Sequence, residues 1–254
     1  MKFSKKAIVV IAIILFTFPF VYLLLLSLAD EWRFPRFLPA NVNLQRWKEA
    51  LEGNNSIFSG LTLSLIIAFF VAFISTLAGF LISRAIAQNQ RRNLLLFFCY
   101  FPMALSPVVY ALLINYFFIR VGLSGSVAGI VMAQLMIALP FAILLLNSFW
   151  NREVSSLEDV SKTLGADFKQ TFFKVLLPVA RPQLLVCCFQ TFLISWFEYG
   201  LTTIIGVGKI QTLTLTVYQY IGEANIYYAA ISSCIIIFPI LILLWINKRF
   251  IYSK

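Results

Sequence analysis

Six long apolar runs dominate the pattern of hydrophobic and polar positions along the chain. Each is at least about as long as the roughly 20 residues that a helix needs to cross a bilayer core of about 30 Å. The pattern therefore predicts an all-α, polytopic membrane protein with six transmembrane helices. The predicted spans are residues 7–29, 57–86, 93–118, 127–150, 184–205 and 228–246.

The composition agrees with a chain that lies in lipid. Hydrophobic residues make up 61% of the 254 positions and charged residues 12%, against about 25% charged residues in ordinary soluble domains. The net charge is +10, but the basic residues form short clusters between apolar runs. Such clusters are typical of loops that fix the orientation of a membrane protein, so nucleic acid is not expected as a partner.

The distribution of basic residues predicts that both termini are cytoplasmic. With that orientation, 14 of the 20 Lys and Arg residues fall in cytoplasmic segments, as the positive-inside rule requires. The 14 are Lys2, Lys5, Lys6, Arg84, Arg91, Arg92, Arg152, Lys162, Lys169, Lys174, Arg181, Lys248, Arg249 and Lys254. The other six are Arg33, Arg36, Arg46, Lys48, Arg120 and Lys209.

The chain carries few groups suited to catalysis or to metal binding. It has no histidine, and the spacing of its four cysteines fits neither a zinc site nor a disulfide framework. The segment 206–210 contains Gly-Lys but lacks the spacing and the Ser or Thr of a phosphate-binding loop. We therefore expect no catalytic residue, no bound metal or other cofactor, and no enzymatic activity of the chain itself.

The polar segment 151–183 is too regularly patterned for a simple connection. Ser155 followed by Glu158 is typical of a helix N-terminus, Gly165 of a helix end, and Asp167 followed by Gln170 of a second N-terminus. The segment therefore predicts two short helices joined at Gly165, which pack on their own bundle, on another protein or on the membrane surface. Apolar residues recur at helical spacing along them: Leu157, Val160, Leu164, Phe168, Phe172 and Val175.

The same segment resembles the cytoplasmic signature of permeases of bacterial ATP-binding-cassette importers, which reads E-A-A, three residues, G, nine residues, I-x-L-P. Residues Asp159 to Ser161 stand at the E-A-A positions, Gly165 at the glycine, and Val175 to Pro178 at the end. The departures are Asp for Glu, Val-Ser for Ala-Ala and Val for Ile, and Glu158 stands one place early. Further similarities lie in residues 77–84, 138–141 and 195–199, so that the resemblance covers about residues 57–250.

The resemblance implies a single permease domain over residues 1–254, in a bacterial inner membrane, with a cytoplasmic coupling loop at about 151–183 before the fifth span. The first short helix would dock on a separate ATPase subunit, which would bind the ATP and Mg²⁺. Implied partners are two ATP-binding subunits, a second permease chain (a paralogue rather than an identical copy) and an extracytoplasmic substrate-binding protein. The expected coupling residues are Leu157, Glu158, Asp159, Val160, Lys162, Leu164, Gly165, Ala166, Phe168, Leu177 and Pro178.

The substrate is harder to infer than the class of transporter. The layout resembles permeases for polyamines, ferric iron, thiamine and phosphonates, whose substrates differ in charge. Glu198 is the one carboxylate inside a predicted span, and either contacts substrate or bridges helices. The expected substrate-pathway residues are Gln190, Ser195, Glu198 and Tyr199. The alternative function is an ion-gradient-driven secondary transporter, but the chain shows no internal repeat and no paired intramembrane charges.

Overall fold

The computed structural model of the protein describes residues 5–30, 41–52 and 55–251. Within these residues the chain is helical, with an isolated antiparallel bridge between Ala29 and Val42. The basic residues Lys2, Arg33, Arg36 and Lys254, which entered the orientation prediction, lie outside the described residues. The all-α prediction is confirmed for the part of the chain that the structure describes.

Five helical stretches in the described residues are long and apolar enough to cross a membrane, and a bent pair of helices adds a sixth if the pair counts as one span. The stretches match the first, second, fourth, fifth and sixth predicted spans to differing degrees. They are Lys6–Ser27, Ser56–Ala87, Val127–Asn147, Phe168–Trp196 and Ile226–Arg249.

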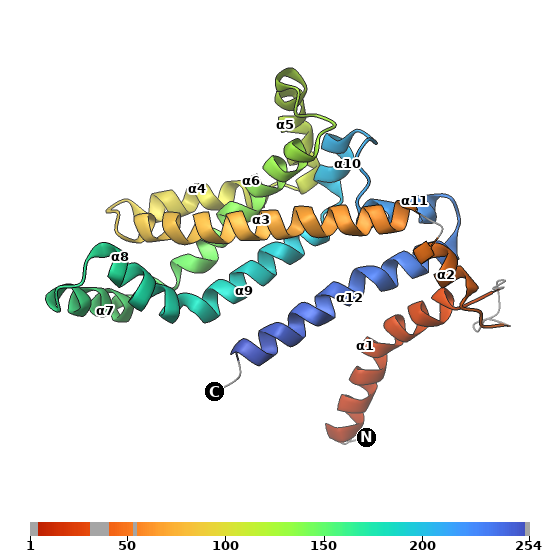
Figure 1. The fold of residues 1–254 in the computed structure, drawn as a ribbon, viewed down its shortest axis with the longest axis horizontal. Coiled ribbons are helices and arrows are strands. Elements are labelled where there is room, and N and C mark those ends of the chain that lie inside the picture. The colour runs from red at the N-terminus through yellow and green to blue at the C-terminus, as the bar shows by residue number, and fades with distance from the viewer. Residues whose placement is uncertain (1–4, 31–40, 53–54, 252–254) are drawn as a thin grey trace. The chain divides into compact units, whose positions relative to one another are not determined.

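The chain forms two compact units. The first comprises Met1–Leu63 and Gln211–Ile240, and the second comprises Ser64–Ile210 and Leu241–Lys254. Two helices, α3 (Asn55–Ala87) and α12 (Ile226–Ile251), contribute residues to both units. Both helices are labelled in Figure 1. The prediction of a single permease domain is not tested by this division and stays a prediction.

In the first unit, Arg46 donates hydrogen bonds to the segment directly after the first apolar helix. The unit contains α1 (Lys5–Ser27), α2 (Gln45–Glu52) and α11 (Leu213–Gly222). The guanidinium of Arg46, on α2, donates hydrogen bonds of 2.6 Å to the backbone carbonyls of Ala29 and Asp30, just after α1. It also lies 3.9 Å from the ring centroid of Tyr227. Hydrogen bonds from a charged donor such as this guanidinium are stronger than those between neutral groups.

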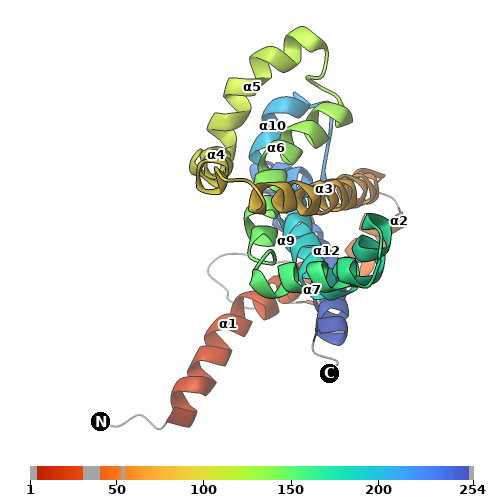
Figure 2. The same ribbon diagram turned by 90° about the vertical axis from the view of Figure 1, so that its left-hand side faces the viewer.

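The third predicted span, residues 93–118, is wrong as one continuous helix. The chain forms α4 (Arg92–Ala104) and α5 (Pro107–Val121), which run in different directions in Figure 2. The bend at the break is 97°. Leu105 and Ser106 are extended at the break. The physical reason is Pro107, because a proline disfavours helical geometry at the residue before it and is well accommodated as the first residue of a new helix.

The fifth predicted span, residues 184–205, is displaced. A helical run begins with α8 (Phe168–Gln170), continues through a π-helical turn η1 (Thr171–Leu176) and ends with α9 (Leu177–Trp196). After Trp196 the chain breaks and forms the short helix α10 (Gly200–Gly206). The second short helix predicted after Gly165 is therefore the beginning of this long run.

The fourth predicted span corresponds to α6 (Val127–Asn147), which packs in the core of the second unit. Aromatic rings from three segments meet at one end of it: the ring centroid of Phe80 lies 5.8 Å from that of Phe149, 5.0 Å from that of Trp150 and 5.9 Å from that of Phe172. Val154, two residues into the next helix, belongs to the same cluster. This cluster positions the polar segment that follows α6.

Candidate functional site

The helix α7 (Arg152–Thr163) forms the first part of the polar segment. Its N-cap is Asn151, whose side-chain oxygen accepts a hydrogen bond of 3.0 Å from the backbone N–H of Val154. The predicted cap of Ser155 with Glu158 is wrong, because Ser155 lies inside the helix and donates to the carbonyl of Asn151 at 3.2 Å. α7 begins earlier than predicted because Val154 is buried in the aromatic cluster.

Gly165 ends α7 as the sequence predicts. Its φ is +81°, which is the left-handed region that favours glycine. Its N–H bonds to the carbonyl of Lys162 at 3.0 Å, and the N–H of Ala166 bonds to that of Ser161 at 3.0 Å. This pair of bonds is the Schellman arrangement, which satisfies carbonyls that a helix end would leave unpaired.

The second predicted cap is also confirmed. The Asp167 side chain accepts a hydrogen bond of 2.6 Å from the N–H of Gln170, and the Gln170 side chain accepts from the N–H of Asp167 at 3.4 Å. These reciprocal bonds start α8 directly after the Gly165 turn. The turn between α7 and α8 is thus defined by hydrogen bonds on both sides.

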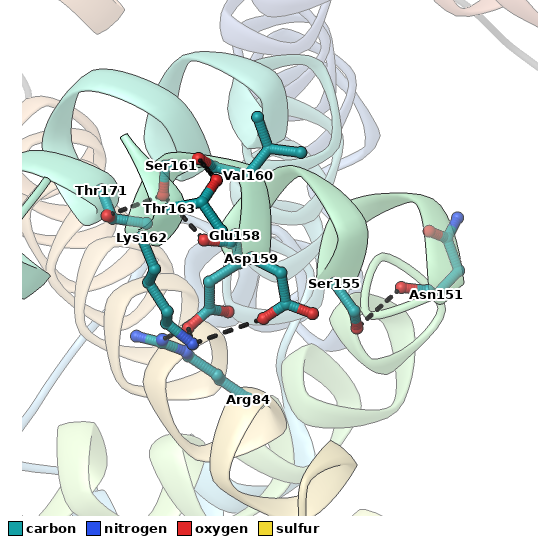
Figure 3. Close-up of polar contacts among 10 residues, drawn as sticks. All are labelled: Arg84, Asn151, Ser155, Glu158, Asp159, Val160, Ser161, Lys162, Thr163 and Thr171. Carbon is teal, nitrogen blue, oxygen red and sulfur yellow. Dashed lines mark hydrogen bonds and ion pairs between the residues drawn. The ribbon is translucent and has the colours of Figure 1, made fainter. Parts of the chain in front are cut away.

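The buried side of α7 is largely polar. The side chains of Glu158 and Arg84, in the last turn of α3, are 10% and 12% exposed, and the closest atoms of the pair are 2.6 Å apart. Ser161 is also buried and exchanges a hydrogen bond of 2.9 Å with Thr171. Figure 3 shows Arg84 and Lys162 converging on the Glu158 carboxylate.

A neighbouring side of α7 is apolar and exposed. Leu157, Val160 and Leu164 are 43%, 55% and 82% exposed, and Figure 3 shows Val160 directed away from Arg84. The continuous apolar stripe predicted from Leu157 to Val175 is therefore wrong in its second half. Phe172 turns into the aromatic cluster, because the Gly165 turn and the π-helical turn change the direction and register of the chain.

Charged residues flank this exposed apolar side. Lys162 lies 3.3 Å from Glu158 and 3.7 Å from Asp159. The carboxylate of Asp159 is exposed, unlike that of Glu158. α7 therefore presents an acid, a base and three apolar side chains to its surroundings.

The remaining predicted coupling residues occupy different surroundings. Phe168 is exposed on one side, and its ring centroid lies 4.8 Å from the Arg84 guanidinium carbon. Ala166 is half-buried in the turn after α7. Leu177 and Pro178 line an apolar groove of about 480 Å³ between α3 and α9, together with Arg181. The sequence-predicted set is thus split between α7, the turn and this groove.

Glu198 lies at the break between α9 and α10. Its carboxylate accepts hydrogen bonds from the backbone N–H of Leu201 at 2.7 Å, from the N–H of Thr202 at 2.9 Å and from the Thr202 hydroxyl at 3.0 Å. The N–H groups at the start of a helix need such acceptors. Glu198 therefore caps the N-terminus of α10.

A buried polar network extends from Glu198 into α6. Thr202 accepts a hydrogen bond of 3.3 Å from the side-chain nitrogen of Gln134, whose oxygen accepts from the Ser195 hydroxyl. Sequence reasoning missed Gln134 and Thr202. Gln134 carried a usable signal, since an amide in the middle of an apolar span requires internal partners.

A pocket of about 310 Å³ adjoins this network. Glu198, Tyr199 and Gln134 line it, together with Pro107 and Val108 at the start of α5. Of the four predicted pathway residues, Glu198 and Tyr199 therefore meet at one pocket. Ser195 is buried in the network, and Gln190 lies half-buried on α9, outside the lining of this pocket.

Residues 75–251 match the model of a protein family described as the binding-protein-dependent transport system inner membrane component. The chain belongs to this family. The matched residues agree with the region of about 57–250 over which the sequence resembled importer permeases. They also contain α7, the Gly165 turn, the polar network and the pocket.

Curated relatives carry names of the same kind. The chain is 25% identical over 217 residues to a putative ferric transport system permease protein of Haemophilus influenzae. The aligned region covers 74% of this chain and 34% of that relative. It is 27% identical over 201 residues to a sulfate transport system permease protein of Synechococcus elongatus, with 70% of each chain covered. It is also 25% identical to a spermidine/putrescine permease protein of Haemophilus influenzae, with 69% of each covered. The chain spans about a third of the length of the ferric-transport relatives.

The fold has a counterpart among solved structures. A chain of a bacterial ABC transporter involved in the import of alginate, an acidic polysaccharide, superposes with a TM-score of 0.68 at 16% identity, over 98% of this chain and 99% of that one. At this level of identity the match concerns the fold alone. The fold of the chain is therefore similar to that of a chain of this transporter.

Proposed function

We propose that the chain is the permease subunit of an ATP-binding-cassette importer, which forms half of a substrate pathway and receives force from a separate ATPase subunit through α7. Membership of the family supports the importer class. The observation that carries the docking role is the exposed apolar side of α7, formed by Leu157, Val160 and Leu164. Fully burying one such side chain stabilises a complex by about 1.5–3 kcal/mol.

The construction of α7 suits a docking element. A helix of this length is marginal alone in water. α7 is stabilised by the N-cap of Asn151 and the C-terminal turn at Gly165, and on its buried side by the packing of Val154 and the ion pair of Glu158. A rigid short helix loses little conformational entropy on binding. The exposed charges of Asp159 and Lys162 would fix the register of the docked surfaces.

The proposed location is the bacterial inner membrane, with both termini and α7 in the cytoplasm. The description of the family as an inner membrane component supports the location. The excess of basic residues in the segments assigned to the cytoplasm supports the orientation. α7 would then face the compartment that contains ATP.

The proposed partners are two ATP-binding subunits, which hold the ATP and Mg²⁺, a second permease chain and an extracytoplasmic substrate-binding protein. We favour a paralogue over an identical copy as the second permease. The names of the relatives range from sulfate to ferric iron and spermidine. These substrates differ in charge sign, so we propose a small solute without assigning its charge.

The proposed pathway passes the pocket lined by Glu198, Tyr199 and Pro107. The start of α5, directly after its break from α4, lines this pocket. Broken helices are a recurring feature of transport pathways because they expose backbone groups to a cavity. The network of Gln134, Ser195 and Thr202 would keep the wall of the pocket rigid.

The test reconstitutes the chain in vesicles with the ATPase subunit that co-purifies with it. It measures the uptake of sulfate, ferric iron and spermidine with ATP present and with ion gradients collapsed by an ionophore. ATP-dependent uptake that survives the ionophore is expected. Uptake that follows the ion gradient and ignores ATP would establish the secondary-transporter alternative instead.

A pair of variants tests the docking side. Leu164→Asp places a charge among the exposed apolar side chains, and should release the ATPase subunit from the purified complex. Ser155→Asp is the matched control, because Ser155 is exposed on another side of the same helix. Equal retention of the ATPase subunit by both variants would refute the docking role of α7.

A further inference from the structure

Arg84 joins the end of α3 to three other segments. It pairs with Glu158 of α7 at 2.6 Å, and its guanidinium carbon lies 4.8 Å from the ring centroid of Phe168 in α8 and 5.9 Å from that of Trp150 after α6. The indole N–H of Trp150 in turn donates to the hydroxyl of Ser83 at 2.9 Å. One side chain thus lies where α3, α7, α8 and the end of the α6 segment meet.

The pair is poorly suited to provide stability alone. Nε of Arg84 is buried and has no hydrogen-bond partner within the part of the chain that the structure describes. A buried ion pair loses much of its Coulomb energy to desolvation, and an unpaired polar atom adds to that cost. An apolar pair would fill the same space without this penalty, so the geometry favours a role in fixing position.

α7 also meets α3 in the aromatic cluster, but apolar contacts of that kind are non-directional. The covalent connection from α7 to α9 runs through the left-handed turn at Gly165, where a β carbon would meet no atom within 4 Å. The connection to α6 is the short segment of Phe149 to Asn151. By contrast, Arg84 belongs to the last turn of a continuous 33-residue helix. A displacement of α7 reaches that helix directly through the Arg84–Glu158 pair.

We infer that Arg84 is a positioning residue that ties α7 to α3, so that movement of α7 is passed to the second membrane-spanning helix. This inference rests on the proposed function of α7 as the docking element. On this inference α7 transmits force to α3 in addition to α9, which is covalently attached to α7. The natural control is Arg91, an exposed arginine in the turn after α3 that has no part in the proposed docking side.

The experiment supplies the reconstituted complex with sulfate, ferric iron or spermidine, the solutes in the names of the relatives. It measures ATP hydrolysis and solute uptake together, and compares the uptake per ATP hydrolysed. Arg84→Met keeps an unbranched side chain but removes the charge and should lower this ratio by about fivefold or more, in the range of typical coupling effects. Arg91→Met makes the same chemical change away from α7 and should leave the ratio close to that of the native chain. The exchange Arg84→Glu with Glu158→Arg should restore part of the lost ratio.

Three results would overturn the inference. The first is an unchanged ratio for Arg84→Met, and the second is a loss of hydrolysis and uptake in equal proportion, which is the mark of a merely structural residue. If Arg84→Met does not assemble, the ratio of Arg84→Gln decides, because this variant also lacks the charge, and an unchanged ratio there is the third. Failure of the proposed function looks different, since the native chain itself would then show no ATP-dependent uptake.

Discussion

Gly79 on α3 and Ala142 on α6 approach each other so closely that a β carbon at position 79 would lie 2.7 Å from Cβ of Ala142. Real β carbons essentially never show such a contact, so two long apolar helices can meet here because position 79 has no side chain. Small residues at helix contacts serve this purpose in membranes, where close packing replaces the hydrophobic effect as the driving force.

The first prediction concerns this contact. Gly79→Ala should lower the stability of the chain by about 1–3 kcal/mol, because the added methyl group forces α3 and α6 apart. The measurement is the thermal unfolding of the detergent-solubilised chain. The double variant Gly79→Ala with Ala142→Gly removes the closest atom and should recover part of the loss. An unfolding midpoint for Gly79→Ala equal to that of the native chain would contradict the prediction.

The second prediction concerns the turn after α7. Gly165→Val should abolish uptake while leaving membrane insertion intact, because a left-handed conformation costs an L-residue about 1–2 kcal/mol and a β-branched residue more. The structure shows no atom within 4 Å of a β carbon at this position, so the effect is one of backbone conformation and not of crowding. Uptake into vesicles and the amount of chain in the membrane are measured together.

Asparagine at the same position is the control, since it tolerates the left-handed region better than other non-glycine residues. Gly165→Asn should therefore retain more uptake than Gly165→Val. Equal uptake by the two variants would show that the φ of +81° is not what the turn requires.

The third prediction separates the two roles considered for Glu198. If the carboxylate serves chiefly to cap α10, Glu198→Gln should lower stability by about 1–3 kcal/mol, because an amide has one acceptor oxygen and cannot satisfy the groups that now donate to both carboxylate oxygens. Thr202→Val keeps the charge but removes one donor of that set and the acceptor of the Gln134 side chain, so it should also lower stability. Both are measured by thermal unfolding alongside uptake. Unaltered stability of Glu198→Gln with a changed preference for substrate charge would favour substrate contact instead.

The sequence located the membrane helices because the bilayer leaves the backbone little choice. In hydrocarbon every N–H and C=O must be paired within the segment, so a long apolar run is a helix. The first, second and sixth predicted spans accordingly lie within a few residues of α1, α3 and α12. The cap at Asp167 and the turn at Gly165 were also predictable, since both depend on hydrogen bonds and dihedral angles of neighbouring residues.

Hydropathy was misleading where the helix and the apolar run have different lengths. Lys174 and Arg181 lie in the helical run that begins at Phe168, although a search for apolar residues places its start after them. The backbone of a helix does not require apolar side chains, and basic ones remain exposed. In the third span the prolines were visible in the sequence, but the bend of 97° depends on what α4 and α5 each pack against.

Taken alone, the sequence determined most of the long apolar helices, the turn at Gly165, and the family to which the cytoplasmic pattern is similar, since these properties depend on neighbours along the chain. Only the tertiary structure decided that Glu158 turns inward to Arg84, 74 positions away, while Leu157, Val160 and Leu164 stay exposed. An amphipathic pattern gives the two sides of a helix but not which of them its own protein covers. That choice depends on the packing of α3, α6 and α9 around it.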